Sequence, residues 1–152
     1  MDPAQLDAAL QTEYLHLQKT IEDFDGKAMT IKAWSVTFSF SVIVGAFASH
    51  APAVLGVAAV SSLLFWFLET MWKSFQLGYY ERAAQIEAHF RDESRLSAPH
   101  QIGASWMQRW RRMSWSEVAR MSLWPHVALP HAAAVLVGAG LLVAAQLGAL
   151  KL

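Results

Sequence analysis

Two long stretches of the chain carry no charged residue, and they predict helices that cross a membrane. Lys32 is followed by no Lys, Arg, Asp or Glu until Glu69, and Arg120 by none until Lys151. Each gap is longer than the ~20 apolar residues that a helix needs to cross ~30 Å of hydrocarbon. A Ser-His-Ala-Pro turn at 49–52 divides the first gap. We therefore expect three spans, at roughly 33–49, 53–71 and 127–150.

The segment before the first span has the pattern of an amphipathic helix over 3–32. Asp2 can cap this helix, and Pro3 suits its first position. Apolar side chains then recur alternately four and three residues apart, which is the a/d spacing of a coiled-coil seam. The seam consists of Leu10, Tyr14, Leu17, Ile21, Phe24, Ala28 and Ile31. No breaker separates this helix from the first span, so we expect one continuous rod.

The second span also continues, without a breaker, into a charged stretch that keeps helical apolar spacing. Its apolar positions are Trp72, Phe75, Tyr79, Ala83, Ile86 and Phe90. The two seams run antiparallel, so the simplest arrangement is a long helical hairpin with its tip in the membrane and its two stalks packed together in water. The same seams would also suit self-association between protomers, and the sequence does not separate the two.

A polar linker at 91–103 leads to a segment rich in Trp and Arg at 104–124. Ser114 and Glu117 fit a capping box, which divides the segment into two short helices. Aromatic and Arg side chains together are typical of helices in the headgroup layer, and they favour contact with anionic lipids over binding of nucleic acid. The expected interfacial anchors are Trp106, Arg109, Trp110, Arg111, Arg112, Trp115, Arg120 and Trp124.

These elements together predict an all-α integral membrane protein. It has a long helical hairpin (two transmembrane spans extended into a cytoplasmic stalk), interfacial amphipathic helices and a third transmembrane helix. The hairpin occupies 1–95, the linker and interfacial helices 96–124, and the third span with a short C-terminal tail 125–152. Composition agrees, because 55% of residues are hydrophobic and only 16% are charged, against ~45–50% and ~25% in soluble domains.

The basic residues predict the orientation of the chain in the membrane. In this arrangement all of them except Lys151 lie on one side. The positive-inside rule then places the N-terminus, stalk and linker in the cytoplasm and the C-terminus outside, most simply in a bacterial inner membrane. The N-terminal segment lacks the basic region and short apolar core of a signal peptide, so we expect the first span to be uncleaved.

Small residues recur at helical spacing on the first and third spans. They are Thr37, Ser41, Gly45 and Ser49 on the first, and Gly140, Ala144 and Gly148 on the third. Apolar lipid gives no hydrophobic drive for helix pairing, so close packing of such faces must supply it. We expect these helix-packing faces to support a homo-oligomer or a complex with a larger membrane protein.

Glu69 is the ionisable residue set most deeply in a span. A carboxylate there is costly and is therefore a functional candidate. Lys73 follows it by four residues, the favourable order for a helical ion pair, and counting back from the turn places Lys32 across the hairpin. We expect an intramembrane ion pair at the cytoplasmic boundary, with an ion or proton path as the alternative.

Two histidines bracket the entry to the third span. His126 and His131 are five residues apart with Pro130 between them, which is not the i, i+4 pair of helical metal sites. We expect both to act as polar anchors of a helix end, while Pro125 and Pro130 set the entry angle. With no cysteine, no phosphate-binding loop and no hydrolase motif, we predict no enzyme activity, no cofactor and no metal.

The plan over 3–95 is similar to that of SLATT-type two-span proteins, which have a membrane hairpin with cytoplasmic helical extensions. That resemblance is one of architecture, and it implies a pore-forming effector in a bacterial stress or defence system; the third span and the Trp/Arg segment depart from it. The function favoured by the sequence is a non-enzymatic membrane scaffold or accessory subunit that acts by association. The alternatives are the pore-forming effector and a small ion or proton transporter that uses Glu69.

Overall fold

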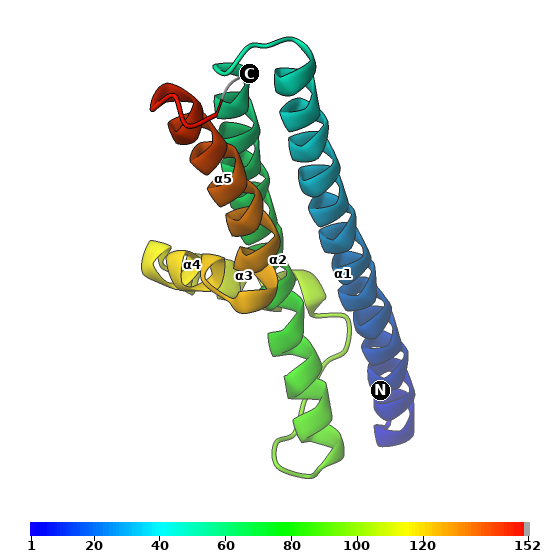
Figure 1. Ribbon diagram of the computed structural model, residues 1–152. Helices are drawn as coiled ribbons and strands as arrows, with labels where there is room; N and C mark the ends of the chain where they lie inside the picture. The colour runs from blue at the N-terminus through cyan, green and yellow to red at the C-terminus, as the bar shows by residue number, and fades with distance from the viewer. Residues whose placement is uncertain (151–152) are drawn as a thin grey trace.

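The computed structural model describes residues 1–150, and these form α-helices and turns without a strand (Figure 1). The helices are α1 (Pro3–Ala48), α2 (Val54–Phe90), α3 (Ile102–Arg112), α4 (Trp115–Ser122) and α5 (Pro125–Gln146). Lys151, the one basic residue expected on the opposite side of the membrane, lies outside the described residues. The all-helical prediction is therefore confirmed.

Three of the helices, α1, α2 and α5, are long and apolar enough to cross a membrane. This agrees with the number of spans predicted from the uncharged gaps. The third differs in its limits, because α5 ends at Gln146 rather than near Leu150. Gly148 has a φ of +71°, a conformation that ends helices readily because glycine lacks a Cβ.

The helix α1 runs unbroken for 46 residues, from a capped N-terminus to the turn. The Asp2 carboxylate accepts a hydrogen bond from the backbone N–H of Gln5 at 2.8 Å, and the Gln5 side chain accepts one from Asp2 N–H at 3.2 Å. This reciprocal pair satisfies two of the amide groups that a helix start leaves free. After the turn, Ala51 N–H bonds to Ala46 O, and α2 begins at Val54.

The helices α1 and α2 lie side by side and antiparallel, and α5 packs along the half of α2 nearest the turn (Figure 1). The short helices α3 and α4 lie across this axis near its middle (Figure 1). Two apolar clusters hold the hairpin. One, near the turn, contains Ile43, Ala46, Leu55 and Ala58. The other, near the opposite end, contains Leu10, Leu17, Ala83 and Ile86.

The contact of α5 with α2 is close enough to require a glycine at 138. A Cβ atom on Gly138 would lie 3.1 Å from the backbone N of Ala59 and 3.3 Å from the carbonyl O of Leu55. Any larger side chain would push the two helices apart. Gly138 therefore sets the depth to which α5 packs against the hairpin, and with it the position of His131 two turns earlier.

Candidate functional site

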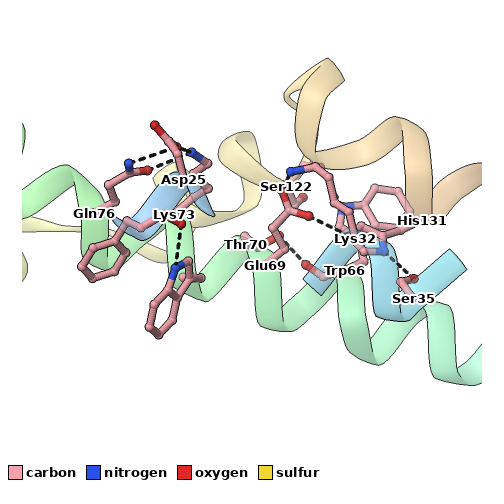
Figure 2. Close-up of polar contacts among 12 residues, drawn as sticks. Asp25, Lys32, Ser35, Trp66, Glu69, Thr70, Lys73, Gln76, Ser122 and His131 are labelled. Carbon is pink, nitrogen blue, oxygen red and sulfur yellow. Dashed lines mark hydrogen bonds and ion pairs between the residues drawn. The ribbon is translucent and has the colours of Figure 1, made fainter. Parts of the chain in front are cut away.

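Four polar side chains from three helices meet where α5 begins to pack on the hairpin; we call them the polar centre (Figure 2). Lys32 and Ser35 come from α1, Glu69 from α2 and His131 from α5. Lys32 Nζ lies 2.5 Å from Glu69 Oε1, and His131 Nε2 lies 2.9 Å from Glu69 Oε2. Ser35 Oγ lies 2.8 Å from His131 Nδ1. Each carboxylate oxygen therefore has its own nitrogen partner.

The polar centre is buried within a single chain. Glu69, His131 and Ser35 are each 0% exposed, and the Lys32 side chain is 16% exposed. No buried side-chain N or O atom among residues 1–150 lacks a hydrogen-bond partner. A buried polar network that is fully satisfied stabilises one arrangement of its helices, because any other arrangement leaves polar atoms unpaired.

The hydrogen-bond roles in the centre follow from the chemistry of the groups. With Glu69 ionised its oxygens only accept, so His131 Nε2 carries a hydrogen and donates it. In the neutral imidazole Nδ1 then accepts from the Ser35 hydroxyl. This order differs from that of a serine hydrolase, where the acid holds Nδ1 and the serine faces Nε2. A substrate cannot reach Ser35 Oγ in this arrangement, because the residue is completely covered.

A short column of hydroxyl groups extends the polar centre toward the turn. Ser39 Oγ donates to Ser35 O at 2.7 Å and lies 2.6 Å from Ser62 Oγ. One turn further, the apolar cluster that includes Ile43 and Ala58 fills the space between α1 and α2. The polar column therefore ends partway along the candidate spans and does not cross them within one chain.

The expected pair between Glu69 and Lys73 does not form, which corrects that part of the prediction. Lys73 Nζ instead lies 2.5 Å from Asp25 Oδ1 and 2.8 Å from Gln76 Oε1, one turn toward the stalk (Figure 2). The other expected partner, Lys32, does lie beside Glu69. The spacing of Glu69 and Lys73 permitted a pair within α2, but Asp25 lies across the hairpin and competes for the same ammonium group.

Further along the stalk, Glu13 joins α1 to α2 and to the linker. Arg82 donates to Glu13 through Nε at 2.8 Å and Nη2 at 3.0 Å, and both side chains are buried. The backbone N–H groups of His100 and Gln101 donate to the same carboxylate at 2.7 and 3.2 Å. Burial alone would raise the pKa of Glu13, but these four donors outweigh it and hold the pKa below its usual value.

The predicted small-residue faces are not those that pack within the chain. Thr37, Ser41, Gly45 and Ser49 are all exposed. The face of α1 that contacts the rest of the chain instead carries Ser35, Ser39, Ile43 and Ala46. On α5, Gly140 is exposed and Ala144 is half-buried, whereas Gly138 makes the close contact; Gly148, which follows the end of α5, is exposed. The faces were expected to pack between chains, and that use stays a prediction.

The Trp/Arg segment divides into side chains that contact α2 and side chains that are free of it. Trp106 Nε1 donates to Phe75 O at 2.9 Å, and its ring fills the space left by Gly78. Trp110 stacks on Trp106 at a centroid distance of 5.7 Å. These two tryptophans, expected as headgroup anchors, are thus half-buried against the hairpin. Their place in the headgroup layer stays a prediction.

Two of the arginines in the segment have carboxylate partners. Arg109 pairs with Glu117 and Arg112 pairs with Glu81. Because the Glu117 side chain pairs with Arg109, only half of the expected capping box forms: the backbone N–H of Glu117 donates to Ser114 Oγ. The remaining expected anchors Arg111, Trp115 and Arg120 are exposed, and Trp124 is half-buried beside the exposed His126.

Sequence reasoning missed Ser35 and His131 as members of the site. His131 was expected to anchor a helix end, and the structure corrects this by placing it, fully buried, between Glu69 and Ser35. A usable signal did exist: an ionisable residue inside a candidate span is by default turned toward the interior of the bundle.

Comparison of the chain with protein-family models, with curated proteins and with solved structures finds no match.

Proposed function

We propose that this is a non-enzymatic membrane protein that acts by association, with its spans packing against further copies of the same chain. The observation that carries the proposal is the exposure of Thr37, Ser41, Gly45 and Ser49 along one face of α1. The opposite small face, which includes Ser35 and Ser39, is already used inside the chain. One helix thus has two faces suited to close packing, and a single chain occupies one of them.

The exposed face is suited to packing rather than to polar recognition. The hydroxyls of Ser41 and Ser49 donate to the carbonyl oxygens of Thr37 and Gly45, both at 2.7–2.8 Å, so they need no outside partner. A Cβ atom at Gly45 would meet nothing within 4 Å in the single chain. In lipid, such a surface allows two helix backbones to approach closely and gain van der Waals contact.

The proposal includes an orientation and a role for the stalk. The stalk and its basic residues lie in the cytoplasm of a bacterial cell, and the turn at 49–52 lies outside. The polar centre fixes the register of α1, α2 and α5, so that the exposed face is presented in one orientation. The stalk then offers a rigid cytoplasmic element on which a partner protein docks.

The mass of the protein in lipid nanodiscs, measured by light scattering, tests this proposal. The wild type is expected to be an oligomer, and Gly45→Leu is expected to shift it toward the monomer by blocking close approach. Gly26→Leu is the matched control, because Gly26 is also an exposed glycine of α1 where a Cβ meets nothing within 4 Å, but it lies in the stalk and outside the face. A monomeric wild type, or a Gly45→Leu protein as oligomeric as the control, would contradict the proposal.

A second candidate, a pore-forming effector, is favoured by the hydroxyl groups on the same exposed face. In a ring of chains, Thr37, Ser41 and Ser49 could line a polar path. Purified protein in planar bilayers would then conduct ions, and a silent bilayer would exclude this function. Transport through Glu69 finds less support, because Glu69 is enclosed within the chain and the polar column ends at the apolar cluster near the turn.

A further inference from the structure

An apolar groove of about 400 Å³ lies between α2 and α4. Trp66, Phe67 and Thr70 of α2 form one wall, and Trp115, Val118 and Ser122 of α4 form the other. The Trp66 indole donates to the carbonyl oxygen of Ser122 at 2.8 Å, which fixes α4 against α2. The groove is therefore a built feature of the fold, with one hydrogen bond holding its two walls together.

The groove lies at the boundary between uncharged and charged stretches of the chain. Thr70 adjoins Glu69, the first charged residue of α2, while Trp66 and Phe67 belong to the uncharged stretch. Large apolar side chains at its rim are open to the surroundings, since Phe67 is 60% and Trp115 75% exposed. In a bilayer this places the groove where acyl chains meet the headgroup layer.

The two short helices, of which α4 forms one wall of the groove, carry more positive than negative charge, and part of the positive charge is unpaired. Four arginines and one glutamate lie on α3 and α4. Arg109 and Arg112 are paired with carboxylates, but Arg111 and Arg120 have no carboxylate within 4 Å in residues 1–150. Arg120 directly follows the groove residue Ala119, and Arg111 is in the last turn of α3, just before α4.

We infer that this groove binds an anionic phospholipid, with one acyl chain between α2 and α4 and the headgroup phosphate near Arg111 and Arg120. An acyl chain gains no hydrophobic free energy by leaving other lipid for the groove, because both surroundings are apolar. Selectivity must then come from the headgroup, and each basic side chain near the surface contributes roughly fivefold in affinity. This site is separate from the exposed face of α1, so the two proposals succeed or fail independently.

Native mass spectrometry of the protein released from nanodiscs that contain equal amounts of phosphatidylglycerol and phosphatidylcholine tests this inference. The protein should retain phosphatidylglycerol in preference to phosphatidylcholine. The double variant Arg111→Gln/Arg120→Gln should lose roughly 25-fold of that preference, from the two arginines together. Arg91→Gln/Arg95→Gln is the matched control, since it removes the same charge at the far end of the stalk and should keep the preference.

Filling the groove provides a second test that changes no charge. Ala119→Trp places a bulky ring in the space meant for the acyl chain and should abolish retention of phosphatidylglycerol, with helix content by circular dichroism unchanged. Several results would overturn the inference: equal retention of the two lipids, equal losses in the two arginine double variants, or full retention by Ala119→Trp. A change of oligomeric state in Ala119→Trp without a change in lipid would instead assign the groove to a helix of a second copy.

Discussion

Replacing Lys32 with Met is expected to lower the free energy of unfolding by about 3–5 kcal/mol, the usual cost of removing one partner from a buried ion pair. Glu69 has no exposed surface, and Lys32 Nζ lies 2.5 Å from its Oε1. Methionine keeps an unbranched apolar stem of similar length, so most packing contacts remain. The variant therefore isolates the loss of the positive charge, and His131 remains as the partner of Oε2.

The double variant Lys32→Met/Glu69→Met separates charge from shape. Replacing both members of a buried pair by apolar side chains of similar volume is often neutral in stability. Here the change also leaves His131 Nε2 without its acceptor, which costs about 1–3 kcal/mol. The double variant should thus be about 2 kcal/mol more stable than the single Lys32→Met variant, although it carries one more substitution.

Reversible unfolding in mixed micelles, followed by tryptophan fluorescence and circular dichroism, measures both quantities. The wild type, Glu69→Met, Lys32→Met and the double variant complete a double-mutant cycle. A loss of under about 1 kcal/mol for Lys32→Met would refute the reasoning, since that is the range of exposed ion pairs. A double variant less stable than Lys32→Met would refute it equally, because charge pairing would then not be what holds these helices together.

Three further predictions concern the stalk. Folding lowers the pKa of Glu13, so the ionised carboxylate stabilises the fold above about pH 4.5, and this stabilisation is lost as the pH falls through the lower pKa of the folded state. Between about pH 6 and pH 3 the melting temperature of the wild type should therefore fall more than that of Glu13→Gln. Gly78→Leu should displace α3, because a side chain there overlaps the Trp106 ring, and thermal melting should show a loss of about 2–3 kcal/mol that is much smaller in a Trp106→Ala background. Gly26→Ala should raise stability by about 1 kcal/mol in the same measurement, since Gly26 is exposed within α1 and a Cβ there meets no atom within 4 Å.

The sequence was sufficient to predict the helical class and the number of candidate spans, because long uncharged stretches depend only on composition. It also indicated that Lys32 and Glu69 lie level, since residues equally far from a tight turn face each other in an antiparallel hairpin. The sequence could not identify His131 of α5 as a partner of Glu69. The helix α5 follows a long linker, and the depth to which it packs depends on Gly138, more than 60 residues from Glu69. For the same reason the sequence did not show which small residues of α1 pack within the chain, because periodicity defines a face but not its direction.

The burial of Trp106 could not be predicted for a related reason. Tryptophan near a membrane boundary is common in the headgroup layer, and no local pattern distinguishes that environment from a notch in a neighbouring helix. The absence of a side chain at Gly78 leaves a notch in α2, and Trp106 occupies it only because α3 folds back against α2. Composition thus indicated an interface, while the pairing of one glycine with one tryptophan depended on the tertiary fold.

The carboxylate of Glu13 has a mechanical consequence. It ties the first turns of α1 to His100 and Gln101, which directly precede α3, although 87 residues separate Glu13 from His100 along the chain. The same carboxylate also holds Arg82 of α2, so its removal would release the start of α3 and the contact between α1 and α2 together. One side chain thus secures both the hairpin and the linker at the end away from the turn.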